Sequence, residues 1–198
     1  MLPSQQSQVG WTRAVAPEAA TGFLASLYDR IRARSSRGQV GHFWQAQALD
    51  PVGLEAVFHH TQALIDEPAP LTRSQAELIA LVVSATNGCD YCVAHHGPRL
   101  ARALEDEPLA RAVAIDYREA NLAARDRVLL DYAVALTCEP AERKLEDVDR
   151  MREYGFEDPA IVRATAIASL YNHVNRVACA LGVTLEPGLE AWEYGSQR

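Results

Sequence analysis

Hydrophobic residues recur at a helical period through nearly the whole chain, and this feature constrains the fold more than any other. Apolar side chains three and four positions apart share one face of an α-helix, whereas alternating apolar and polar residues indicate a strand. We find no clear alternating run, and Gly, Asn and Pro stand at the boundaries of the periodic segments. The sequence therefore predicts an all-α protein, and its 198 residues fit a single domain over 1–198.

Helix boundary signals divide the chain into three groups of helices. The N-terminal group spans residues 17–66 and includes an amphipathic helix over 17–34 and a second helix capped by Asp50. The C-terminal group spans residues 122–182. The acidic stretch before it, residues 105–107, is expected to be a solvated loop.

The central group, residues 71–104, predicts a helical hairpin. Thr72, with Gln75 three positions on, has the signature of a capping box that starts the first arm. Asn87-Gly88 ends this arm, because glycine readily takes the left-handed conformation at a helix C-terminus. Cys89 then opens the second arm, so the two arms are expected to lie antiparallel.

Composition and charge restrict the binding partners and the cellular location that we expect for this protein. A net charge of −7 and a pI near 5.4 argue against a nucleic-acid surface, which needs clustered Lys and Arg. No apolar run approaches the roughly 20 residues of a membrane-spanning helix. The first ten residues also lack the basic and apolar regions of a signal peptide. We therefore expect a cytoplasmic protein that binds neither nucleic acid nor a membrane.

Cys89 and Cys92 form a CxxC motif at the predicted start of a helix. Unpaired backbone N–H groups and the helix dipole favour thiolate over thiol there, so one of the two thiols is expected to be unusually acidic. Two cysteines within one helical turn can also form a disulfide after a modest adjustment. One sulfur can then attack a substrate while the other resolves the product.

His96 and Glu77 are candidate proton-transfer residues beside the cysteines. His96 follows Cys92 by four positions and so shares its helix face. In the antiparallel hairpin Glu77 falls within one turn of His96, and burial would raise the pKa of Glu77 toward neutral pH. We expect Glu77 to be the ultimate base and His96 the shuttle. Cys92 would then be the attacking thiolate, and Cys89 the resolving thiol and proton donor.

A zinc site is the main alternative for this cluster. The four soft ligands that it offers are Cys89, Cys92, His95 and His96. Adjacent histidines diverge by about 100° on a helix and cannot easily converge on one ion together with both sulfurs. The sequence therefore predicts no metal.

The remaining cysteines and the last histidine show no partner at an informative spacing. Cys138 and Cys179 stand alone in apolar helical segments, where free cysteine usually behaves as a small buried hydrophobe. His173 is expected to be a satisfied core residue. None of the three is assigned to the site.

A family resemblance follows from four residues at the spacing E-x11-C-x2-C-x3-H, namely Glu77, Cys89, Cys92 and His96. This pattern resembles the signature of AhpD-type alkylhydroperoxidases. Leu71-Thr72 through Asn87-Gly88-Cys89, together with residues 171–176, is similar to the uncharacterised peroxidase-related branch of the AhpD-like, carboxymuconolactone decarboxylase superfamily. Some members have a histidine just before the second cysteine, where this chain has Tyr91. This difference concerns the identity of the reductant and the efficiency of turnover more than the thiol chemistry.

The resemblance implies an all-helical subunit, assembled into a homo-oligomer, that reduces hydroperoxides. Cys92 would form a sulfenic acid and then a disulfide with Cys89. No metal or organic cofactor would be needed, and a small redox protein or a lipoyl-type dithiol would return the electrons.

Two other functions fit parts of the pattern. The superfamily suggests a carboxymuconolactone decarboxylase-like activity, although that chemistry does not call for a thiol pair. A redox-sensing or protein-interaction module would use the same disulfide to change a binding surface without turnover. We expect a thiol-dependent peroxidase that acts on hydrophobic or organic hydroperoxides.

Overall fold

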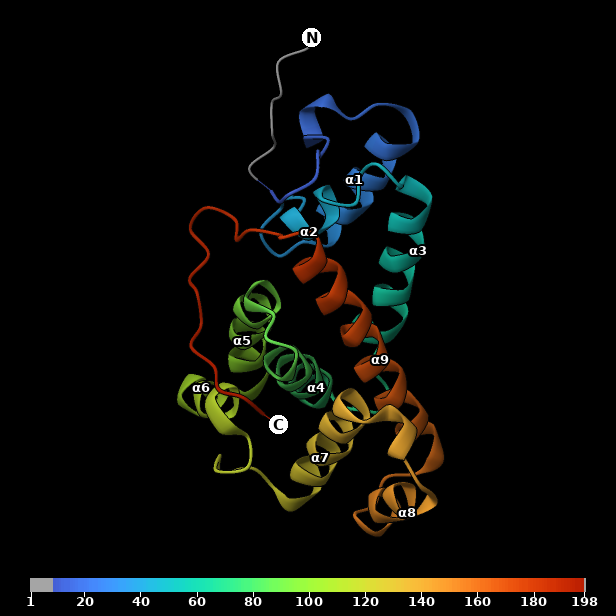
Figure 1. Ribbon diagram of the computed structural model, residues 1–198, viewed down its shortest axis with the longest axis vertical. Coiled ribbons are helices and arrows are strands. Elements are labelled where there is room, and N and C mark those ends of the chain that lie inside the picture. Colours follow the sequence, from blue (N-terminus) through green and yellow to red (C-terminus); the bar gives the residue numbers. More distant parts are fainter. Residues whose placement is uncertain (1–8, 198) are drawn as a thin grey trace.

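The computed structural model describes residues 9–197, and this part of the chain is helical and contains no strand (Figure 1). The all-α prediction is confirmed. Short helical turns occur at Pro17–Ala19, Gln62–Asp66 and Pro140–Glu142. The α-helices are α1 (Gly22–Arg34), α2 (His42–Gln45), α3 (Pro51–Thr61), α4 (Arg73–Thr86), α5 (Asp90–Leu104), α6 (Glu107–Asp116), α7 (Ala124–Cys138), α8 (Leu145–Glu153) and α9 (Asp158–Ala180).

Helix α4 lies at the centre of the fold. Its side chains from Gln75 to Thr86 are all buried, because α5, α6, α7 and α9 pack around it. The predicted capping box starts this helix: the Thr72 hydroxyl accepts from the Gln75 N–H, and the Gln75 side chain accepts from the Thr72 N–H, both at 3.1 Å. A helix that is enclosed on all sides has little room for polar side chains, so Glu77 within it requires explanation.

The turn between α4 and α5 places both cysteines at the start of α5. Gly88 has a φ of +66°, the left-handed conformation predicted for it. Cys89 is the N-cap residue of α5, and Cys92 lies in its first turn. The boundaries of this pair of helices thus follow from local sequence signals.

Two hydrophobic clusters make up the core. The large one surrounds α4, and the small one joins α1 to α3 through Leu27, Ile31 and Phe58. Trp44 packs against both clusters. The first helix begins at residue 22 rather than at 17, and Phe23 is 48% exposed, so it does not belong to the buried face of α1.

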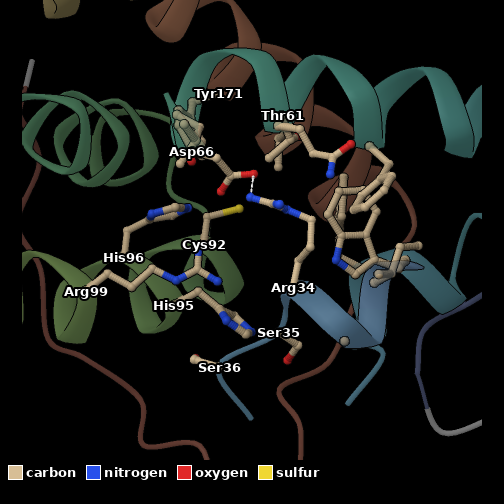
Figure 2. Close-up of a pocket in the computed structure, with 18 of the residues that line it drawn as sticks. Arg34, Ser35, Ser36, Thr61, Asp66, Cys92, His95, His96, Arg99 and Tyr171 are labelled. Atoms are coloured by element: carbon tan, nitrogen blue, oxygen red, sulfur yellow. Dashed lines mark ion pairs between the residues drawn. The ribbon is translucent and has the colours of Figure 1, made fainter. Parts of the chain in front are cut away.

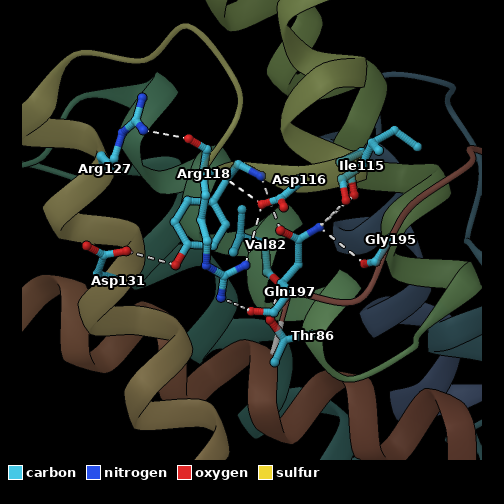
Figure 3. A network of polar contacts seen from close by, with 11 residues as sticks. Val82, Thr86, Ile115, Asp116, Arg118, Arg127, Asp131, Gly195 and Gln197 are labelled. Atoms are coloured by element: carbon cyan, nitrogen blue, oxygen red, sulfur yellow. Dashed lines mark hydrogen bonds and ion pairs between the residues drawn. The ribbon is translucent and has the colours of Figure 1, made fainter.

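The C-terminal segment after α9 runs back over the body of the protein (Figure 1). Trp192 is buried against Gly97 of α5, where a Cβ atom would lie 2.2 Å from the indole ring. Near its end, the buried Gln197 side chain accepts from the Tyr117 N–H at 3.2 Å and donates to the Ala114 carbonyl at 2.8 Å (Figure 3). These contacts fix the segment to α5 and α6.

Helix α6 begins at Glu107, so the solvated loop expected at residues 105–107 is confirmed only in part: Glu105 and Asp106 form an exposed turn before the helix. The Asp106 side chain accepts from the Leu109 N–H at 2.9 Å and caps the helix, with Pro108 in its first turn. The acidic residues are therefore both an exposed turn and the start signal of the next helix. Among residues 9–197, no helix has both the length and the apolar character needed to cross a membrane.

Candidate active site

The two cysteines of the CxxC motif are both buried and hydrogen-bonded to each other. The Cys89 thiol donates to the Cys92 sulfur, with 2.9 Å between the two Sγ atoms. This hydrogen bond and burial raise the pKa of Cys89, so Cys89 stays protonated. The expected acidic thiol is therefore not Cys89, and the Cys92 sulfur is the hydrogen-bond acceptor of the pair.

Cys92 lines a cavity of about 260 Å³, whereas Cys89 does not reach it. The cavity lies between the two hydrophobic clusters, with walls from α1, α3, α5 and α9. Figure 2 shows the Cys92 sulfur pointing into this space, with His96 and Arg99 along the same side. A small molecule in the cavity can thus contact the Cys92 sulfur. Cys89 lies outside the cavity and contacts Cys92 through their hydrogen bond.

His96 and Glu77 form a buried pair between the two arms of the hairpin. His96 Nδ1 lies 2.8 Å from Glu77 Oε2, so the register predicted from the hairpin places the two residues together. The other carboxylate oxygen, Oε1, lies 2.7 Å from the Arg73 guanidinium, an ion pair without the angle of a hydrogen bond. Glu77 is thus held between a histidine and an arginine.

The charge state of Glu77 differs from the expectation. Burial alone would raise its pKa, but the hydrogen bond with His96 and the charges of His96, Arg99 and Arg73 outweigh burial and hold the pKa below its usual value. The expected raised pKa is wrong, and Glu77 is a carboxylate at neutral pH. At neutral pH Glu77 is therefore a buried anion beside His96.

Glu77 fixes the histidine beside it. Burial lowers the pKa of His96, although the hydrogen bond and charge of Glu77 oppose the change, so the imidazole is neutral at pH 7. An ionised Glu77 accepts the proton on Nδ1, which leaves Nε2 as the free basic nitrogen. The ring also packs edge-on against Tyr171, with 4.6 Å between ring centroids.

Helix α9 contributes Tyr171 and attaches itself to the cysteine turn. The Asn87 side-chain amide donates to the side chains of Asn172 and Asn175, at 3.1 and 2.9 Å. Asn175 in turn donates to the Ser84 hydroxyl at 3.0 Å. The residues that carried the family resemblance near the end of the chain thus secure the turn before Cys89.

A second buried carboxylate, Glu186, comes from the C-terminal segment. The Tyr91 hydroxyl donates to one of its oxygens at 2.7 Å, and His95 Nε2 lies 3.0 Å from the other. Burial opposes ionisation of Glu186, but His95, the His42 N–H and Tyr91 lower its pKa to about 2. Tyr91 also accepts from the Phe43 N–H at 3.2 Å, so the tyrosine of the CxxC motif links three parts of the chain.

The structure overturns the placement of three other residues. Cys138 and Cys179 are exposed rather than buried, and His173 is exposed rather than in the core. Cys179, in the last turn of α9, interacts with the Cys89 thiol, whereas Cys138 has no such neighbour. In the described part of the chain, no three His, Cys, Asp or Glu side chains converge as a metal site would require.

The sequence analysis did not identify Arg73, Tyr171 and Glu186 as site residues. Arg73 precedes Glu77 by four positions on the same helix, so an i, i+4 pairing rule would have found it. Tyr171 and Glu186 reach the site only through the packing of α9 and of the C-terminal segment. No periodicity or spacing predicts this contact, although Tyr171 lies in the segment 171–176 that carries part of the family resemblance.

The carboxymuconolactone decarboxylase family matches residues 51–135, which include both arms of the hairpin. A comparison with curated proteins gives no match. Among solved structures, an AhpD-core, uncharacterised peroxidase-related protein from Ralstonia eutropha JMP134 is 25% identical with a TM-score of 0.84, and the match covers 92% of this chain and 95% of that one.

Two further structures are similar over nearly the whole length. An uncharacterised peroxidase-related protein from Silicibacter sp. TM1040 is 26% identical with a TM-score of 0.78, and the match covers 96% of each chain. The debrominase Bmp8 is 18% identical with a TM-score of 0.71, covering 94% of this chain and 95% of that one, a likeness of fold alone. The family match over residues 51–135, the fold and the two peroxidase-related structures together support a place in the AhpD-like, carboxymuconolactone decarboxylase superfamily.

Proposed function

We propose that the protein is a thiol-dependent peroxidase that reduces hydroperoxides through Cys92 and Cys89. The observation that carries the proposal is the position of Cys92, which lines the cavity while its sulfur accepts a hydrogen bond from the Cys89 thiol. His96, oriented by Glu77, lines the same cavity. The description of two similar structures as peroxidase-related supports this class of chemistry.

The first step forms a sulfenic acid on Cys92. His96 takes the thiol proton through Nε2, and the thiolate attacks the outer oxygen of the hydroperoxide ROOH. A sulfur–oxygen bond forms and the O–O bond breaks, so sulfur is oxidised and the peroxide is reduced. The departing RO⁻ takes the proton from His96 and leaves as the alcohol ROH.

The second step converts the sulfenic acid into a disulfide. The Cys89 sulfur attacks the Cys92 sulfur, and the hydroxyl group leaves as water with the Cys89 proton. The hydrogen bond between the two sulfurs already places them for this step. An external dithiol, either a small redox protein or a lipoyl-type group, then reduces the disulfide and is itself oxidised.

We also propose that the subunit works as a homo-oligomer in the cytoplasm, as the superfamily resemblance implies. Exposed apolar side chains such as Leu49 and Val52, at 58% and 72% exposure, support an assembly that covers them. Light scattering of the purified protein gives the subunit number. A monomer at micromolar concentration would contradict this part of the proposal.

The test is hydroperoxide consumption with excess dihydrolipoamide as reductant, in wild type and three cysteine variants. We expect Cys92→Ser to abolish consumption, Cys89→Ser to stop after one turnover, and Cys138→Ser to behave as wild type. Cys138 is the control because it is exposed and lies outside the cavity. Full activity in Cys92→Ser refutes the proposal, and one stoichiometric oxidation of wild type without recycling indicates a redox sensor instead.

A further inference from the structure

The cavity in front of Cys92 is rich in positive charge, although the chain as a whole has a net charge of −7. Only one carboxylate, Asp66, lines the cavity, and Glu77 lies behind it. The arginines that line it are Arg34, Arg73, Arg99 and Arg102.

Two of these arginines have carboxylate partners and two do not. Arg34 forms an ion pair with Asp66, and Arg73 with Glu77. Within residues 9–197, the side chains of Arg99 and Arg102 have neither a hydrogen-bond nor an ion-pair partner. Arginines therefore outnumber carboxylates at this site, and two of them make no direct contact with a carboxylate.

Of the two unpaired arginines, Arg99 is the better placed to bind an anion near Cys92. It is partly buried, whereas Arg102 is exposed. It follows His96 by three positions, and its charge acts on both His96 and Glu77. Figure 2 shows its guanidinium directed into the cavity beside Cys92. A partly desolvated guanidinium without a partner is costly, and an anionic ligand would offset that cost.

The rest of the cavity is suited to an apolar group. Ile31, Phe43, Trp44, Phe58 and Ile65 line it on the side of the N-terminal helices. A volume of about 260 Å³ corresponds to a small organic molecule and not to a long chain. The ligand that fits both features has a compact apolar body and one negative charge.

We propose that Arg99 binds the carboxylate of the substrate, so that the enzyme acts on hydroperoxides of small organic acids. Arg99 binds the carboxylate through its paired N–H groups, and the apolar body packs against the aromatic side chains. The peroxide group then faces Cys92. This inference deepens the proposed function and rests on it for the reaction, whereas the recognition of an anion rests on the charges of the cavity.

The experiment separates recognition from turnover. Calorimetry on the reduced protein compares 4-isopropylbenzoate with its neutral amide, in wild type, Arg99→Gln and Arg99→Lys. Peroxide consumption compares cumene hydroperoxide with its para-carboxylate. Arg13→Gln is the matched control, because Arg13 is exposed, lies outside the cavity and also lacks an ion-pair partner in the described chain.

We expect wild type to bind 4-isopropylbenzoate more tightly than its amide and to consume the carboxylated peroxide faster than cumene hydroperoxide. In Arg99→Gln, each of these two ratios should fall by about 10- to 100-fold. Arg99→Lys should keep part of them, and Arg13→Gln all of them. Equal binding of acid and amide by wild type, or undiminished acid binding by Arg99→Gln, overturns the inference. If neither peroxide is consumed but acid binding depends on Arg99, anion recognition stands and the peroxidase proposal fails.

Discussion

Replacing Glu77 with Gln removes one negative charge from a fully buried position and keeps the shape of the side chain. Glu77 Oε2 lies 2.8 Å from His96 Nδ1, so the amide oxygen of Gln can still accept the same proton. A charge-assisted hydrogen bond contributes about 1.5–3 kcal/mol and a neutral one about 0.5–1.5 kcal/mol. Arg73 is half exposed and can return to water at little cost. We therefore expect a loss of about 1–2 kcal/mol in the free energy of unfolding at pH 7.

The sign of the pH dependence of stability follows from the direction of the Glu77 pKa shift. The pKa of Glu77 is below its usual value, so its contribution to stability is present above the unfolded value of 4.5 and is lost as pH falls through the folded value. The difference in stability between wild type and Glu77→Gln should therefore shrink below pH 4.5. Urea denaturation at pH 7 and at pH 4 measures it.

Activity provides the sharper test of Glu77. In the proposed mechanism its carboxylate stabilises the imidazolium that forms when His96 accepts the thiol proton, and general-base catalysis contributes about 10²–10⁴-fold. We expect Glu77→Gln to lose a large part of this factor in kcat. The acid limb of its pH–rate profile should move to lower pH, because Glu77 raises the pKa of His96.

Glu153→Gln is the control for this substitution, since Glu153 is exposed at the end of α8. An acid limb that stays in place or moves to higher pH in Glu77→Gln would refute the proposed role of Glu77. A full-speed variant with a wild-type profile would show that Glu77 only fills space.

Two further substitutions test the C-terminal segment. Gly97→Ala places a Cβ 2.2 Å from the Trp192 ring, so we expect a loss of about 1–3 kcal/mol in urea denaturation and a change in tryptophan fluorescence; unchanged stability would contradict this packing. Tyr91→Phe removes the hydroxyl that joins Glu186 to the Phe43 N–H, and we expect a loss of about 1–3 kcal/mol with the cysteine reactivity retained. Stability equal to wild type would show that these contacts do not form in solution.

Local signals predicted the helices around the cysteines because each boundary has its own cap. Thr72 and Gln75 form the capping box, and Gly88 takes the left-handed conformation, as their sequence pattern indicates. Residues 105–107 were expected to be a solvated loop, and Glu105 and Asp106 do form an exposed turn. Weighing the charges alone missed the helix start given by Asp106 followed by Glu107 and Pro108.

The site residues on the α4–α5 hairpin could be predicted from the sequence. The site residues that come from distant segments of the chain could not. Glu77 and His96 occupy two arms joined by a short turn, so counting residues places them together. Tyr171 and Glu186 depend on tertiary packing, which no local pattern encodes. The sign of the Glu77 pKa shift also required Arg73 and Arg99 in place, because burial alone acts in the opposite direction.

The division of the cavity wall between two hydrophobic clusters has a consequence for how the proposed activity can change its substrate. Both sulfurs belong to the large cluster around α4, where almost any replacement disturbs packing. The facing wall comes from α1 to α3 and the small cluster. Mutations there can reshape substrate preference at little cost to the chemistry, so new specificities can arise in the first third of the chain while the reacting groups stay constant.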